Sequence, residues 1–71
     1  MDAASINAAI ARNIRELRES RGLSQERFGE GIGVSGSAVS LWERCKRRIF
    51  LKHICRMCKA YDVPINQILD G

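Results

Sequence analysis

Residues 22–44 read GLSQERFGEGIGVSGSAVSLWER, and this stretch contains two short helical segments separated by a tight turn. Ser24 and Ser35 are favoured N-cap residues, and they predict helices over about 25–31 and 36–44. Gly33 ends the first segment, and only Val34 separates it from the cap of the second helix. Because so short a connection packs two helices at an angle, the stretch predicts a helix-turn-helix pair.

The second of these helices has two faces of different character. Val39 and Trp42 lie three residues apart on one face, which we expect to pack inward. The opposite face carries small, polar and basic residues and one leucine: Gly36, Ser37, Ser40, Leu41 and Arg44. A leucine among small polar residues is not a core pattern. We therefore expect this face to contact a binding partner.

Helical spacing of apolar residues continues on both sides of this stretch. Before it, with Ser5 as a candidate N-cap, the spaced residues are Ile6, Ile10, Ile14 and Leu17. After it, they are Leu51, Ile54, Met57, Cys58 and Tyr61. A last short helix, with Pro64 in its first turn, carries Ile65, Ile68 and Leu69. The sequence thus predicts an all-α fold, a compact five-helix bundle whose second and third helices form the helix-turn-helix.

Length and composition allow one small domain. Seventy-one residues are too few for two domains with a cleft between them, and a hydrophobic fraction of 45% with 28% charged residues is typical of a globular protein. No apolar run approaches the roughly 18 residues of a membrane span, and the N-terminus lacks the pattern of a secretory signal. We expect a single helix-turn-helix domain over residues 1–71 and a cytoplasmic location.

Positive charge is concentrated in one segment. The net charge is +4, yet residues 44–59 hold seven of the twelve basic residues and none of the eight acidic ones. The rest of the chain has five basic against eight acidic residues and therefore a net charge of −3. A basic segment on an acidic body favours an oriented anionic partner, with nucleic acid ahead of a membrane surface.

Several runs within residues 10–70 form a specific combination. They are Gly22-Leu23-Ser24-Gln25, Phe28-Gly29, Ile32-Gly33-Val34-Ser35 and Ala38-Val39-Ser40-Leu41-Trp42-Glu43-Arg44. This combination resembles the Cro/CI-type helix-turn-helix family of phage repressors and their XRE-like, lambda-repressor-like bacterial relatives. The sequence departs from the family pattern at Cys45, where Gly is usual, at Ile49, where Pro is frequent, and at Gly29, where a small Ala is usual.

The resemblance implies a sequence-specific regulator of transcription that binds double-stranded DNA, a repressor similar to phage repressors or to restriction-modification controllers. It implies a structural ion pair between Arg18 and Glu43, and a homodimer on a palindromic operator. We expect the dimer surface to consist of Val63, Ile65, Ile68 and Leu69. An antitoxin-type protein-interaction module that also binds DNA is the alternative.

The expected DNA contacts fall into two groups. The base-reading group is the outward face of the second short helix: Gly36, Ser37, Ser40, Leu41 and Arg44. The phosphate group combines two helix starts with a basic loop: Ser24, Gln25, Ser35, Lys46, Arg47 and Arg48. Since the base-reading side chains are mostly small, we expect DNA shape and paired half-sites to contribute much of the specificity.

Other classes of site have weaker support. Cys55 and Cys58 lie one helical turn apart, with Cys45 and His53 nearby in sequence, but a mid-helix pair is not the usual arrangement of a zinc site. We expect reduced thiols, no metal, no cofactor and no small-molecule ligand. The lone His53 lies among basic residues, where we expect it to be solvated rather than catalytic, so the sequence does not predict an enzyme.

Overall fold

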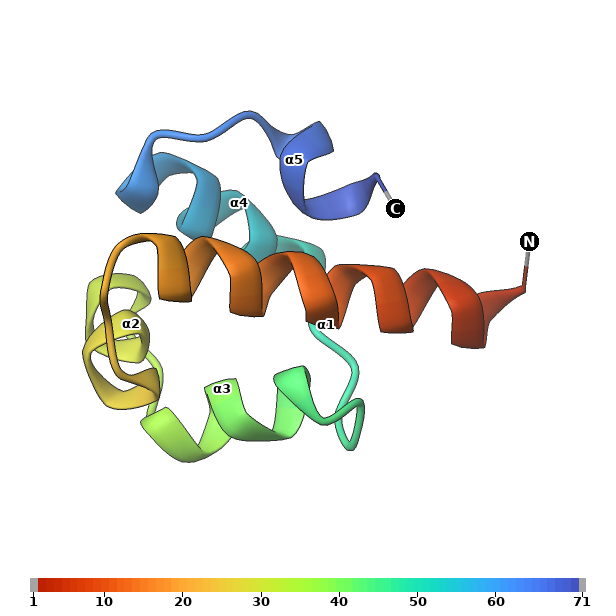
Figure 1. Ribbon diagram of the computed structural model, residues 1–71, viewed down its shortest axis with the longest axis horizontal. Coiled ribbons are helices and arrows are strands. Elements are labelled where there is room, and N and C mark those ends of the chain that lie inside the picture. Colours follow the sequence, from red (N-terminus) through yellow and green to blue (C-terminus); the bar gives the residue numbers. More distant parts are fainter. Residues whose placement is uncertain (1, 71) are drawn as a thin grey trace.

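The computed structural model describes residues 2–70, which form five helices and no strand (Figure 1). In chain order the helices are α1 (Ala3–Ser20), α2 (Gln25–Ile32), α3 (Gly36–Glu43), α4 (Leu51–Tyr61) and α5 (Ile65–Leu69). The expected all-α fold is confirmed, with α2 and α3 as the helix-turn-helix pair. Met1 and Gly71 of the expected domain lie outside the described residues.

Side-chain caps set the starts of the first three helices. The Oδ1 atom of Asp2 accepts a 2.8 Å hydrogen bond from the N–H of Ser5, so α1 starts earlier than expected and Ser5 is not its N-cap. Ser24 and Ser35 cap α2 and α3 as expected, each through a hydrogen bond of 3.1 Å. Pro64 is the N-cap residue of α5 and not part of its first turn.

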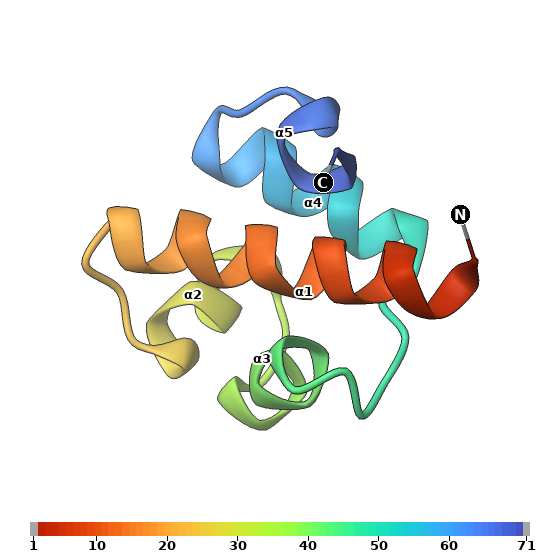
Figure 2. The same cartoon turned by 45° about the vertical axis from the view of Figure 1, so that its right-hand side comes forward.

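The core draws apolar side chains from all five helices. In both ribbon views α1 runs between two pairs of helices, with α4 and α5 on one side and α2 and α3 on the other (Figures 1 and 2). The rings of Phe28 and Tyr61 stack with centroids 4.7 Å apart, and the Tyr61 hydroxyl donates a 2.8 Å hydrogen bond to the Phe28 carbonyl. The buried cluster consists of Ile10, Ile14, Leu17, Phe28, Ile32, Val39, Trp42, Ile54, Met57 and Ile68.

Glycine allows α2 to pack closely against the turn and the start of α3. Gly33 ends α2 in the left-handed conformation, with a φ of 77°. A Cβ on Gly29 would lie 2.5 Å from the carbonyl oxygen of Val34 and 3.0 Å from that of Ser35. Backbone atoms have no room to move away, so only glycine fits at this position. Gly29 therefore lets α2 approach the backbone of the turn closely.

Asn13 fastens α5 to α1. Its Nδ2 atom donates hydrogen bonds to the carbonyl oxygens of Ile68, at 2.9 Å, and Asp70, at 2.5 Å. Since α5 has only five residues, it is too short to be stable as an isolated helix. Its position therefore depends on these bonds and on the burial of Ile68.

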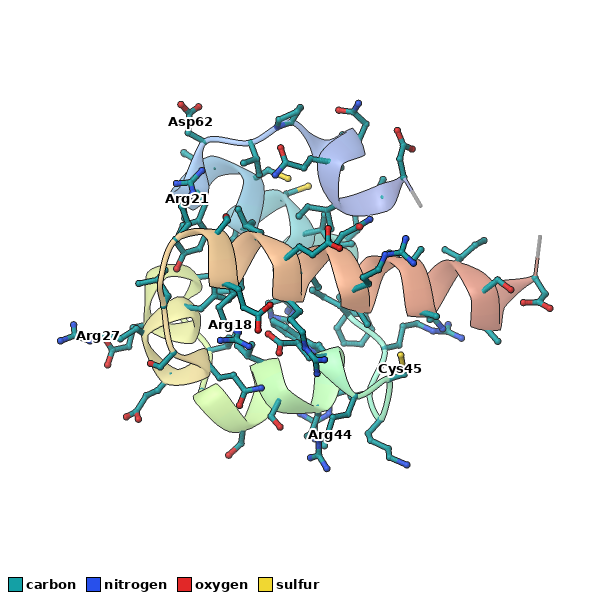
Figure 3. The ribbon with its side chains drawn as sticks, viewed as in Figure 1. Arg18, Arg21, Arg27, Arg44, Cys45 and Asp62 are labelled. Carbon is teal, nitrogen blue, oxygen red and sulfur yellow. The ribbon has the colours of Figure 1, made fainter. Side chains whose placement is uncertain are left out.

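A buried carboxylate joins α3 to both α1 and α2. The side chain of Glu43 has no exposed surface, and Arg18 donates to it from Nε at 2.7 Å and from Nη2 at 3.1 Å. Arg15 and Gln25 donate to the same carboxylate at 3.4 and 3.2 Å. Figure 3 shows Arg18 between α1 and α3. Arg18 also donates to the Leu23 carbonyl at 2.9 Å, so the guanidinium has partners on both sides.

These partners determine the protonation of Glu43. Burial acts to raise the pKa of the carboxyl group, but the hydrogen bonds from Arg18, Gln25 and Arg15 outweigh burial and hold the pKa below its ordinary value. A carboxyl group whose pKa is lower in the folded than in the unfolded chain stabilises the fold at pH values above its unfolded pKa, which is about 4.3. That contribution is lost as the pH falls through the folded-state pKa of Glu43.

Replacing Glu43 should reveal this contribution. Glu43→Gln removes the charge that balances Arg18, so we expect the free energy of unfolding to fall by about 2–3 kcal/mol at about pH 7. Urea unfolding of both proteins should show this difference shrinking as the pH falls below the ordinary pKa of a glutamate and through the lower pKa of Glu43 in the folded chain, where the wild-type carboxyl group becomes protonated. A difference independent of pH would contradict the assigned role.

Trp42 should be a main determinant of the position of α3. Its side chain is only 4% exposed, so Trp42→Ala should lower the free energy of unfolding by about 3–5 kcal/mol. Phe50→Ala is the control, because Phe50 is 64% exposed and its loss should change stability by about 0.5 kcal/mol or less. Thermal unfolding followed by circular dichroism compares the two variants. Equal stability of both would mean that α3 is rotated from the orientation described.

Candidate nucleic-acid interface

An open groove runs between α2 and α3, and most of the expected DNA-contacting residues line it. From α2 and its cap come Ser24 and Gln25, and from the start of α3 come Ser35 and Gly36. The complete lining is Ser24, Gln25, Glu26, Glu30, Val34, Ser35, Gly36, Ser37, Ser40, Leu41 and Arg44. The fold thus brings together the five residues expected to read bases and three of the six expected to contact phosphates.

The outward face of α3 is small and polar, with one basic residue at its end. Ser37 and Arg44 are exposed, whereas Gly36, Ser40 and Leu41 are half-buried beside α2. Arg44 is the C-cap residue of α3, and Figure 3 shows its side chain extending away from the body of the molecule. This face offers serine hydroxyls, an aliphatic side chain and a guanidinium, which are the groups that contact base edges in a major groove.

The residues at the helix starts have other partners as well. The Oγ atoms of Ser24 and Ser35 accept hydrogen bonds from the backbone N–H groups of Arg27 and Ala38. The side-chain amide of Gln25 donates to Glu43 and is therefore turned toward the buried carboxylate. What each helix start presents to an anion is its first backbone N–H groups, which have no partner within the helix.

The basic loop folds back on the end of α3. The backbone N–H groups of Lys46 and Arg47 both donate to the Leu41 carbonyl, at 2.8 and 3.3 Å. Cys45 has a φ of 58°, in the left-handed region that glycine adopts most readily. This conformation explains why glycine is usual at this position in the family that the sequence resembles. Lys46, Arg47 and Arg48 are all exposed. The backbone of Lys46 and Arg47 is therefore held against the last turn of α3, while Arg47 and Arg48 lie on the side of the loop that faces α1.

Two carboxylates in the groove were not expected from the sequence. Glu26 and Glu30 line it from α2, and both side chains are exposed. Glu30 lies 3.8 Å from Arg27 on the next turn of the same helix. Helical spacing places these residues on α2, but their position beside α3 depends on how closely the two helices pack. The glycine at residue 36 was the available signal of that closeness.

His53 packs behind α3. Its ring lies 5.2 Å from the ring of Trp42 and 6.3 Å from that of Phe50, measured between centroids. The Nδ1 atom is buried, and no residue within 2–70 forms a hydrogen bond with it. Burial, and then the positive charges of Lys52 and Arg56, lower the pKa of His53. The expectation that His53 is solvated is therefore corrected: it supports Trp42 from α4.

The three cysteines lie in different surroundings. Cys45 and Cys55 are exposed, whereas Cys58 is half-buried against the core. Burial, with a smaller contribution from Cys55, raises the pKa of the Cys58 thiol. In the part of the chain that the structure describes, no three His, Cys, Asp or Glu side chains are grouped closely enough to hold a metal ion.

The apolar residues of α5 divide between core and surface. Ile65 and Leu69 are 41% and 39% exposed, and Val63 before the helix is half-buried. Ile68 has no exposed surface, so its expected place in a dimer surface is corrected: it packs within its own chain. Over residues 2–70, no helix combines the length and the apolar character that crossing a membrane requires.

Comparison with known proteins places this geometry in a family. The model of the family described as helix-turn-helix matches residues 14–68. Curated relatives are 31–34% identical to the chain over 56–68 residues. The chain spans about half the length of most of these relatives, and 28–64% across the set.

Solved structures are similar over nearly the whole chain. The hypothetical transcription factor NHTF from Neisseria is 33% identical, with a TM-score of 0.85 over 97% of this chain and 79% of that one. The restriction-modification controller C.AhdI from Aeromonas hydrophila is 31% identical (TM-score 0.81), and the P22 c2 repressor is 27% identical (TM-score 0.78); each match covers 87% of this chain and 94% of the other. The chain belongs to the helix-turn-helix family of Cro/CI-type, XRE-like regulators.

Proposed function

We propose that this chain is a sequence-specific regulator of transcription, a repressor, which inserts α3 into the major groove of double-stranded DNA. The observation that carries the proposal is the shared groove, where the outward face of α3 lies beside the free N–H groups of two helix starts. The P22 c2 repressor, similar in fold, was crystallised with a synthetic operator, which supports duplex DNA as the partner. The proposed role involves no catalytic step, cofactor or small-molecule ligand. The proposed location is the cytoplasm, where the protein would bind DNA.

Positively charged side chains would supply much of the affinity for DNA. Lys46, Arg47 and Arg48 are exposed beside the end of α3, where they would reach the phosphates that flank the major groove. Ser24 and Ser35 mark the helix starts, whose N–H groups bind phosphate oxygens well. Such contacts orient a protein on the duplex but carry no sequence information.

The outward face of α3 carries few side chains that can distinguish one base from another. A serine hydroxyl accepts or donates at several bases, and Leu41 offers an apolar surface to a thymine methyl group. Arg44 is the C-cap residue of α3, and its guanidinium could contact either a guanine or a phosphate. We propose that sequence-dependent DNA shape complements these contacts.

We propose that two copies of the chain bind one DNA site together. An eight-residue helix is about 12 Å long and covers only a few base pairs, so two copies on a palindrome are needed for a site of useful length. We propose that the copies meet through Val63, Ile65 and Leu69. The support is the exposure of Ile65 and Leu69 on a helix whose remaining apolar residue is buried in the core.

The direct test is selection of bound sequences from a random duplex pool, followed by titration at several salt concentrations. With about five phosphates neutralised by each copy, affinity for the selected duplex should fall about 10³- to 10⁵-fold between about 50 and 200 mM salt. Lys46→Ala should make this dependence less steep, and Arg12→Ala, an exposed α1 residue outside the groove, should not. Binding without salt dependence would contradict the role of the basic loop.

Leu41 should affect base preference and leave the fold intact. Leu41→Ala removes a half-buried side chain from the groove, so we expect preference at one base pair to fall by about 1 kcal/mol or less. Titration of the selected duplex and of random DNA measures the change, with circular dichroism as the check on folding. An equal loss on both duplexes would assign Leu41 to packing.

A further inference from the structure

The first residue of α3 has no side chain, and α2 occupies the space that one would need. A Cβ on residue 36 would lie 2.9 Å from the Cα of Glu26, 3.0 Å from its backbone nitrogen and 3.2 Å from its Cβ. These distances are well below the 3.5–4.0 Å at which carbon atoms pack. Only glycine fits at residue 36. The first residue of α3 therefore has no side chain with which to contact a base in the major groove.

Glu26 stands beside this gap. It lines the same groove as Gly36 and Ser37, and it is exposed. Across residues 2–70, no ion pair or side-chain hydrogen bond occupies its carboxylate, whereas Glu30 on the same groove lies 3.8 Å from Arg27. The Cβ of Glu26 lies 3.2 Å from the position that a Cβ of residue 36 would occupy, so the Glu26 side chain begins beside the place where residue 36 has none.

We propose that Glu26 replaces the missing side chain of residue 36 and reads a cytosine in each half-site. This inference rests on the proposed function and names a base reader on α2. An ionised carboxylate only accepts hydrogen bonds, and the N4 amine of cytosine presents a donor in the major groove. Guanine presents two acceptors there, and adenine presents an acceptor next to its amine, so both are disfavoured.

The negative charge has a second effect. A carboxylate that faces DNA is repelled by the phosphates of any sequence, so it weakens binding to random duplexes. At a cytosine the hydrogen bond offsets this repulsion. Glu26 therefore increases the ratio of operator affinity to random-DNA affinity in two ways: it binds cytosine, and it repels other sequences. The other side chains of this surface are mostly small and contribute less to that ratio.

Selection from a random duplex pool with the wild-type chain, Glu26→Ala and Glu16→Ala tests the proposal. Glu16→Ala is the matched control, because Glu16 is an exposed carboxylate on α1 outside the groove. We expect Glu26→Ala to lose about tenfold in preference for cytosine at one base pair of each half-site, while the other positions are unchanged. Its affinity for random DNA should rise more than that of Glu16→Ala.

Three outcomes would overturn the proposal in distinguishable ways. If Glu26→Ala binds every duplex more tightly and selects the same operator, Glu26 acts only as a repelling charge. If the selected operator and the affinities are unchanged, Glu26 does not approach DNA, although the proposed function stands. If the wild-type chain selects no sequence at all, the proposed function fails together with this inference. Circular dichroism of both variants confirms that a change in preference does not come from unfolding.

Discussion

The position of α3 depends on a carboxylate that has no contact with solvent. Glu43 receives hydrogen bonds from Arg18 and Arg15 of α1 and from Gln25 of α2. A buried charge without partners is strongly unfavourable, so α3 is stable only where these donors meet it. Trp42, the residue before Glu43, packs into the core from the same helix. Charge and packing thus fix both the rotation of α3 and the direction in which its outward face points.

Much of this arrangement could be predicted from the sequence, because apolar spacing and cap residues act locally. The inward position of Val39 and Trp42 and the caps at Ser24 and Ser35 follow from spacing alone. The start of α1 was missed because Asp2 lies before the apolar pattern begins. Within α5, the sequence could not distinguish buried from exposed apolar residues, since its orientation is set by contacts with α1 that are distant in sequence.

The site shows the same limit. The outward face of α3 could be predicted because it is the complement of the packed face. The groove could not, because it belongs to two helices, and its depth depends on the backbone contact between Glu26 and Gly36. Gln25 was expected at a phosphate, and its side-chain amide also donates a hydrogen bond to Glu43, which the sequence pattern did not indicate. Contacts that depend on a neighbouring helix are those that pattern alone misses.

The bond between Asn13 and α5 has a consequence for the kinetics of folding. It joins residues that are 55 and 57 positions apart, whereas the contacts between α2 and α3 are local. Closing a long loop has an entropic cost that local contacts do not share, so α5 should dock after the helix-turn-helix has formed. During synthesis, the surface of α1 that α5 covers stays bare until residues 65–70 have emerged. Chains in which α5 is not yet docked therefore expose apolar surface of the kind that chaperones and proteases recognise.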